Sequence, residues 1–71
     1  MIIDNLSEAE KRIIQLSLDG LSTKEMARVL NNSPRTIDAH RLHILNKVNA
    51  KSILHVIGMM YRELNERSTN I

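Results

Sequence analysis

Residues 22–47 read STKEMARVLNNSPRTIDAHRLHILNK, and this stretch predicts two helices joined by a tight turn. Ser22 and Glu25 form a capping box, in which each side chain accepts a hydrogen bond from the backbone N–H of the other residue. Two asparagines follow the apolar stripe of this first helix. Asn31 or Asn32 can end it, because asparagine adopts positive φ at modest cost. The first helix is therefore expected to be short and to stop abruptly.

The second helix has its own start and stop signals. Ser33 is a favourable N-cap, and Pro34 fits the first helical position. Weak helix propensity at Asn49 places the end of this helix near Val48. Only residues 31–33 are expected to connect the two helices, so they must cross at a steep angle. This is the arrangement of a helix-turn-helix.

One further helix is predicted on each side of this pair. Ser7 and Glu10 form another capping box, and Gly20 ends the helix that the box opens. Ser52 caps a last helix that runs to about Asn65. The side chains expected on the buried side of the N-terminal helix are Leu6, Ile13, Ile14 and Leu18.

The composition of the 71-residue chain fits one small helical domain. Residues 1–71 are expected to form an all-α, four-helix domain with an ordered core at about 6–65 and a frayed polar end at 66–71. Aliphatic residues must supply the core, because the chain has no cysteine and Tyr61 is its only aromatic residue. No segment is apolar enough to span a membrane and no secretory signal opens the chain, which predicts a soluble, cytoplasmic protein.

Neither catalysis nor a cofactor is expected. The chain has two glycines, no glycine-rich phosphate loop and no Ser-His-acid set with supporting context. His40 and His43 are three residues apart, a spacing compatible with two metal ligands. No third ligand follows nearby, however, and His40 leans towards the core while His43 points outward. We therefore assign no catalytic residue and no metal site.

Positive charge is concentrated in the middle of the chain, although the net charge is only +2. Residues 24–51 hold six of the ten lysines and arginines but only two of the eight acidic residues. A helix over 34–47 in this region would turn Ile37 and Ile44 towards a core. Its opposite face carries Arg35, Asp38, Ala39, Leu42, His43 and Asn46. A purely solvated face would be richer in Glu and Lys, so this mixed face predicts contact with a partner.

The chain resembles the DNA-binding domain of LuxR-, FixJ- and NarL-type transcription regulators. The motifs that carry the resemblance are LSxxE, GLSTKEMARVL, SPRTIDAHR, LNKV and AKS. They run from Leu6 to about Leu64 and match the FixJ branch best. The resemblance implies a four-helix LuxR-type C-terminal effector domain that binds double-stranded DNA, with a last helix often used for dimerisation. Members of these families usually also carry an N-terminal receiver or ligand-binding domain.

Three positions depart from the family pattern. Ala9 stands where an arginine is usual, so one polar anchor of the N-terminal helix is missing. Asn32 replaces a usual aliphatic residue, so the turn loses an apolar contact with the core. Asp38 stands where many members have lysine, although FixJ-like sequences are acidic there. Contacts made by lysine-bearing relatives are therefore not transferred to Asp38.

The resemblance and the mixed face together predict that residues 34–47 enter the major groove of DNA. Arg35 can reach a guanine edge or a phosphate, and Asp38 can accept a hydrogen bond from a cytosine amino group. Ala39 and Leu42 can contact thymine methyl groups. The alternative is that Arg35 and Asp38 form only a solvated (i, i+3) pair and that the other two are ordinary exposed side chains.

Phosphate contacts are expected from polar and basic groups around this face. The residues are Thr23, Lys24, Thr36, Arg41, His43, Asn46, Lys47 and Lys51. Any one lysine or arginine taken alone is as well explained as a charge that keeps the protein soluble. Together they predict a one-sided basic patch.

Residues 53–64 are apolar nearly all round, which predicts a partner for the side that the core leaves uncovered. That side is assigned to Leu54, Ile57, Gly58 and Tyr61. A homodimer through this strip would match a two-fold operator. The alternative is a helix with one face that is merely less polar than average.

Two other functions stay open. A stand-alone domain would pair with a full-length regulator through the last helix and block it. A sigma-factor region-four module would bind RNA polymerase and a promoter element, but the apolar last helix and the AKS motif argue against it. The expected partners are double-stranded DNA and a second copy of the chain. RNA polymerase or a full-length regulator are the alternatives, and no membrane is expected.

Overall fold

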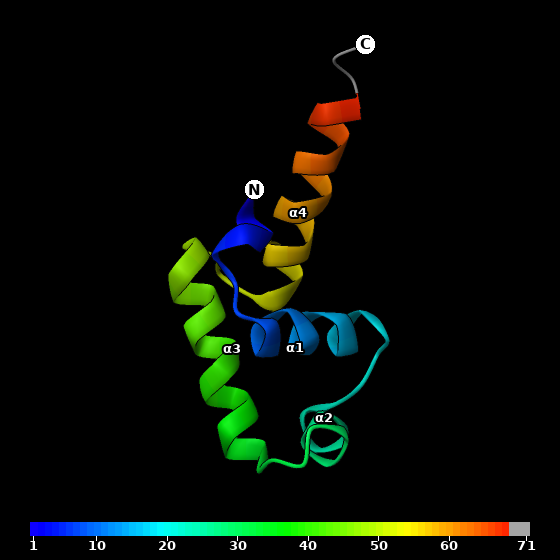
Figure 1. Cartoon of the computed structure of the whole chain (residues 1–71), viewed down its shortest axis with the longest axis vertical. Coiled ribbons are helices and arrows are strands. Elements are labelled where there is room, and N and C mark those ends of the chain that lie inside the picture. Colours follow the sequence, from blue (N-terminus) through cyan, green and yellow to red (C-terminus); the bar gives the residue numbers. More distant parts are fainter. Residues whose placement is uncertain (69–71) are drawn as a thin grey trace.

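The computed structural model describes residues 1–68 and confirms the all-α fold class. Over these residues a 3-10 helix, η1 (Ile2–Asn5), precedes four α-helices, and there is no strand. The α-helices are α1 (Glu8–Leu18), α2 (Thr23–Val29), α3 (Pro34–Val48) and α4 (Ile53–Ser68). In Figure 1, α3 lies in the plane while α2 is seen nearly end-on, so the steep crossing of the helix-turn-helix is confirmed.

The capping residues open the first three α-helices as predicted. Ser7 Oγ accepts a hydrogen bond from the Glu10 backbone at 3.2 Å, and the Glu10 carboxylate accepts one from the Ser7 backbone at 2.8 Å. Ser22 and Glu25 repeat both bonds at the same distances. Ser33 caps α3, which has proline as its first residue. Each box satisfies two N–H groups that a helix start leaves without a partner.

A residue with left-handed backbone conformation follows each of α1, α2 and α3. Asn31 has φ 54° after α2, Asn49 has φ 55° after α3, and Gly20 has φ 86° after α1. Of the two asparagines considered for the first of these turns, it is Asn31 that adopts positive φ. The connection between α2 and α3 comprises residues 30–33, one more than predicted, because α2 already ends at Val29.

The last helix, α4, begins as predicted but runs further. Ser52 Oγ accepts a hydrogen bond from the His55 backbone at 3.1 Å. His55 Nδ1 accepts one from the backbone N–H of Lys51, the residue before the cap serine, at 3.0 Å, whereas the glutamates of the other boxes accept from the cap serine itself. The helix continues to Ser68 instead of ending near Asn65. Glutamate and arginine, which follow Asn65, are good helix formers, and no glycine or proline stops them. Residues 66–68, predicted to belong to the polar end, are thus part of α4, and residues 69–71 lie outside the described part.

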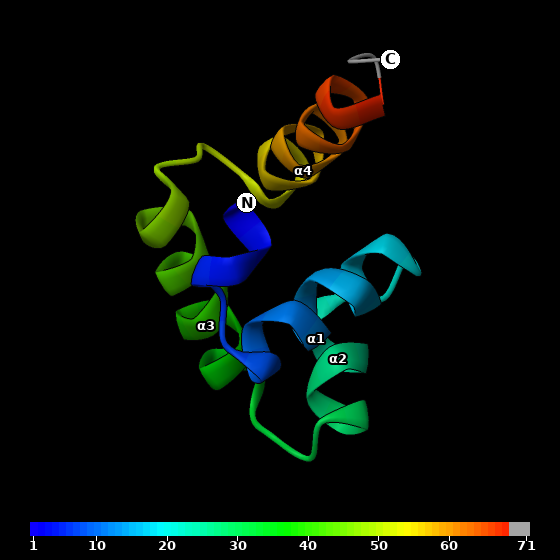
Figure 2. The same cartoon turned by 45° about the horizontal axis from the view of Figure 1, so that its top comes forward.

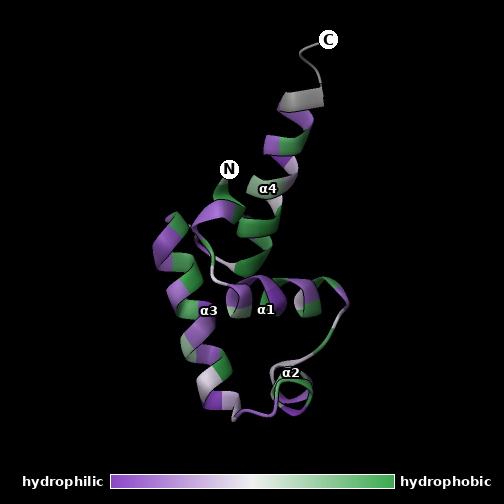
Figure 3. Cartoon of the chain, in the orientation of Figure 1, coloured by the Kyte–Doolittle hydropathy of each residue, from purple (hydrophilic) through white to green (hydrophobic). Residues whose placement is uncertain are grey.

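The core lies where α1, α3 and α4 meet, with α2 closing one side (Figure 2). Its buried members are Leu6, Ile13, Ile14, Met26, Ala27, Ile37, Ile44 and Val56. Figure 3 shows hydrophobic residues gathered where the first turns of α4 approach α1, and hydrophilic residues over much of α3. The prediction that Leu18 is buried is wrong, because its side chain is 55% exposed. Leu16 packs against the core in the last turn of α1 instead.

The single turn η1 was not predicted from the sequence. The backbone N–H of Ile2 donates to both carboxylate oxygens of Glu63, at 2.9 and 3.2 Å, and so ties this turn to α4. Ile3 of η1 and Met60 of α4 line the same small apolar hollow beside α1. None of the helices in residues 1–68 is long and apolar enough to cross a membrane.

Candidate nucleic-acid interface

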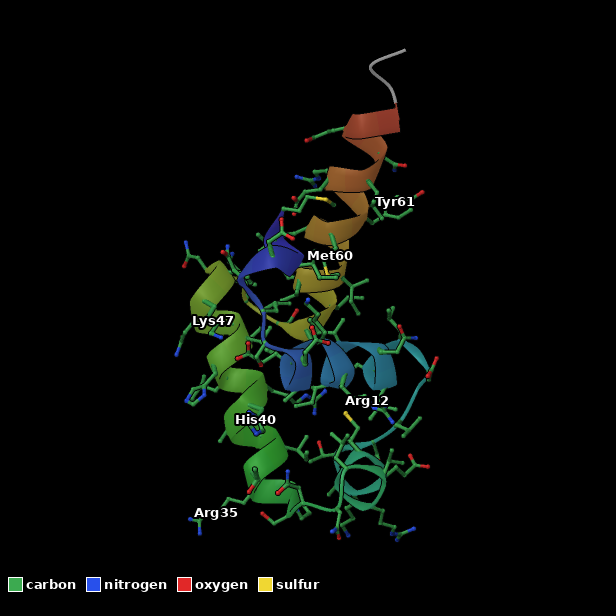
Figure 4. All side chains as sticks on the ribbon, in the orientation of Figure 1. Arg12, Arg35, His40, Lys47, Met60 and Tyr61 are labelled. Carbon is green, nitrogen blue, oxygen red and sulfur yellow. The ribbon has the colours of Figure 1, made fainter. Side chains whose placement is uncertain are left out.

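The outer face of α3 is exposed along its whole length. Ile37 and Ile44 are fully buried on the opposite side and fix the rotation of the helix about its axis. The six residues predicted on this face are all exposed, and so are Pro34 and Lys47; the six are Arg35, Asp38, Ala39, Leu42, His43 and Asn46. Figure 4 shows Arg35 at the outer end of α3, Lys47 near the other end and His40 between them.

The predicted alternative of an Arg35–Asp38 ion pair does not occur among the ion pairs of residues 1–68. Both side chains are exposed, so the guanidinium donors and the carboxylate acceptors stay accessible. A guanidinium presents paired donors in a plane, which suits the two acceptors on a guanine edge. The start of α3 can therefore offer both a donor and an acceptor to base edges.

A hydrogen bond between α2 and α3 joins two of the residues predicted to contact phosphates. Arg41 donates from Nη1 to Thr23 Oγ1 at 2.8 Å, and both side chains are half-buried. Thr23 is the first residue of α2 and Arg41 lies in the middle of α3. The bond holds the two helices of the helix-turn-helix in register in the protein alone.

Lys47 makes the other long-range polar contact of α3. Its ammonium lies 2.7 Å from Oε1 of Glu10, and the two side chains are 43% and 5% exposed. Glu10 also closes the capping box of α1, so one carboxylate serves both the start of α1 and the second half of α3. In the sequence, Glu10 is identified only as a helix cap, and the pair with Lys47 was not predicted. A buried acid requires a partner, but its position 37 residues from Lys47 gave no local signal.

The other residues predicted to contact phosphates make no long-range polar contact within residues 1–68 like those of Arg41 and Lys47. Lys24 and Lys51 are exposed, and the Thr36 hydroxyl lies 2.9 Å from Ser33 Oγ. The rings of His40 and His43 meet edge to face, with centroids 6.5 Å apart. Among residues 1–68 no three His, Cys, Asp or Glu side chains come together as a metal site would need.

Comparison with known proteins identifies the domain. The family described as bacterial regulatory proteins, luxR family, matches residues 4–60. This chain belongs to the luxR family.

Several named proteins are similar to this chain in sequence. The transcriptional regulatory protein FixJ of Rhizobium meliloti is 37% identical over 57 residues, which cover 80% of this chain and 28% of FixJ. The uncharacterized response regulatory protein YgeK of Escherichia coli is 37% identical over 59 residues, or 83% of this chain and 40% of YgeK. The oxygen regulatory protein NreC of Staphylococcus carnosus is 43% identical over 47 residues, or 66% and 22% of the two chains.

This luxR-family chain spans less than half the length of these relatives. No solved structure matches it significantly. The resemblance to the LuxR and FixJ type drawn from the motifs is confirmed, and with it the assignment to DNA-binding helix-turn-helix domains of transcription regulators.

The exposed apolar side of α4 is the second surface predicted from the sequence. Leu54 is 77% and Tyr61 65% exposed, and Gly58 between them is exposed as well. These three residues repeat at four and three positions, so they share one face of the helix. Ile57 is only partly exposed, because its side chain also packs against the core. The luxR-family domain thus carries a mixed polar and apolar face on α3 and an apolar strip on α4.

Proposed function

We propose that this luxR-family domain is a sequence-specific regulator of transcription that inserts α3 (residues 34–47 above all) into the major groove of double-stranded DNA. The observation that carries the proposal is the exposed face of α3, which combines hydrogen-bonding and apolar groups while Ile37 and Ile44 anchor the other side. A helix of this width fits the groove, where base edges present donors, acceptors and thymine methyl groups. Because the partner is chromosomal DNA, the domain would act in the cytoplasm.

Four residues would read bases. Arg35 would donate to a guanine edge, and Asp38 would accept from a cytosine amino group. Ala39 and Leu42, exposed one turn further along α3, would pack on thymine methyl groups. Because no ion pair joins Arg35 to Asp38 among those of residues 1–68, neither side chain would have to leave a partner to reach DNA.

Contacts to the phosphates of the DNA backbone would surround the base-reading face of α3. Lys24, His43, Asn46 and Lys51 are exposed and would meet phosphates directly, together with the hydroxyl of Thr36. Thr23 and Arg41 would offer to a phosphate the donors that their mutual bond leaves over. Lys47 would share its ammonium between Glu10 and a phosphate, since its side chain is partly exposed. Such contacts fix position on the duplex and supply the salt-dependent part of affinity.

The domain would act as a homodimer through the apolar strip of α4, formed by Leu54, Ile57, Gly58 and Tyr61. Exposed apolar side chains on one helix face favour burial against a second copy, and a two-fold dimer would require a two-fold DNA site. Gly58 has nothing within 4 Å of where a Cβ would stand, so two α4 helices would approach closely there.

Base reading is tested by comparing Arg35→Ala with Lys24→Ala on a duplex selected for binding and on a scrambled duplex. Arg35→Ala is expected to weaken binding to the selected duplex by about 1–3 kcal/mol and to relax preference at one base position. Lys24→Ala is expected to weaken both duplexes alike and to lower the salt slope by about one. If Arg35→Ala weakens binding to both duplexes equally, Arg35 does not read a base.

A further inference from the structure

A basic hollow of about 490 Å³ lies between α2 and the turn that leads into α3. Its lining holds two cationic side chains, two side-chain amides and no carboxylate; the residues are Lys24, Ala27, Arg28, Asn31, Asn32 and Pro34. Ala27 is the buried member of the set, and the other five are exposed. Because it lacks an acid, the hollow suits an anion.

The two cations are arranged to act together. Lys24 and Arg28 are one turn apart on α2, so they share a face of the helix. Neither takes part in the ion pairs found among residues 1–68. Glu25, their acidic neighbour, uses its carboxylate to accept from the Ser22 backbone at 2.8 Å. The hydrogen bonds with Ser22, and to a smaller extent the nearby positive charge of Arg28, hold the pKa of Glu25 below its ordinary value.

The turn fixes the other donors. The Asn31 N–H donates to the Arg28 carbonyl at 3.2 Å, and the Asn32 N–H to the Ala27 carbonyl at 2.8 Å. These bonds hold the backbone in the left-handed turn and use its N–H groups. The side-chain amides of both asparagines are exposed and take part in none of the side-chain hydrogen bonds found among residues 1–68. Each amide can donate to an anion.

The structure assigns this hollow a DNA backbone phosphate, held by Arg28 and Lys24 with an amide donor from Asn32. The inference rests on the proposed function and adds Arg28 and Asn32 to the contacts considered above. DNA is the partner favoured by position, because Pro34 lines the hollow and the next residue, Arg35, starts the exposed face of α3. In Figure 1, α2 and the first turn of α3 lie at the same end of the molecule, so one DNA strand can meet both.

The test measures binding to a selected duplex at several salt concentrations for the wild type, Arg28→Gln and a matched control, Arg62→Gln. Arg62 is also exposed, but it lies on α4 near η1, away from the hollow. Arg28→Gln is expected to lower the salt slope by about 0.9 and to leave the preferred bases unchanged, since a phosphate contact carries no sequence information. Arg62→Gln is expected to leave the slope unchanged. Thermal unfolding of each variant checks that it is folded.

The outcomes separate this inference from the proposed function. If the wild type selects a motif but Arg28→Gln leaves the salt dependence of binding unchanged, the phosphate assignment is overturned. The hollow would then be a candidate site for an acidic protein surface. A changed base preference also overturns it, because Arg28 would then read sequence. A wild type that shows no salt-dependent binding to DNA removes the proposed function, and this inference with it.

Discussion

The end of α3 depends on one asparagine. Asn49 has φ 55° and ψ 47°, and the N–H groups of Asn49 and Ala50 both donate to the Leu45 carbonyl. Glycine adopts this conformation without a Cβ penalty, whereas alanine does not. Asn49→Gly is therefore expected to leave the free energy of unfolding within a few tenths of a kcal/mol of the wild-type value or to raise it. Asn49→Ala is expected to lower it by about 1 kcal/mol.

Urea denaturation measures both effects. The control is Asn46→Gly, the same change inside α3, where glycine is expected to cost a few tenths of a kcal/mol. Equal free energies of unfolding for Asn49→Ala and Asn49→Gly would mean that the left-handed conformation imposes no cost at this position.

At the scale of elements, the Glu10–Lys47 pair couples the start of α1 to the second half of α3. Glu10→Gln keeps an acceptor for the Ser7 backbone but removes the charge opposite Lys47, so it is expected to lower the free energy of unfolding by about 1–3 kcal/mol. Glu25→Gln makes the same change in an exposed capping box that has no such pair. We expect that control to cost about 0.5 kcal/mol or less. Urea denaturation at pH 7 compares the two, and equal losses would contradict a role for the pair.

The same pair predicts a dependence on pH. Burial acts to raise the pKa of Glu10, but hydrogen bonds from Lys47 and the Ser7 backbone outweigh it and hold the pKa below the ordinary 4.5. A pKa that is lower in the folded state means that the carboxylate stabilises the fold fully above about pH 4.5 and loses this contribution as the pH falls through the folded-state value. The stability difference between the wild type and Glu10→Gln is therefore expected to shrink from pH 7 to pH 3. A constant difference would contradict this linkage.

Local signals predicted most of the elements, and contacts between distant residues account for what was missed. Serine caps, glutamates three residues later and asparagines at positive φ act within one turn, so they could be identified in the sequence. The turn η1 depends on Glu63, 61 residues away from Ile2, and could not. The exposure of the α3 face followed from helical periodicity. The Thr23–Arg41 bond did not, because it depends on how α2 crosses α3.

At the scale of the whole molecule, α4 gives the domain its elongated shape of 44 × 22 × 19 Å and projects beyond the other helices (Figure 1). Tyr61 lies on the projecting part (Figure 4). If the α4 strip forms the dimer, Tyr61→Glu is expected to give monomers by light scattering, because it places a charge in an apolar contact. Val29→Glu on α2, where the side chain is 52% exposed, is the control and is expected to stay dimeric. A wild type that is monomeric at high concentration and on DNA would contradict the dimer.

The central claim is sequence-specific reading of DNA by a two-fold dimer. Selection of bound sequences from a random duplex library, repeated at two salt concentrations, tests it most directly. We predict enrichment of a short two-fold motif that persists at the higher salt, because base contacts add to the salt-sensitive phosphate term. No enrichment, with salt-sensitive bulk binding alone or no binding, would contradict the claim. It would favour a domain that pairs with a full-length regulator and blocks it.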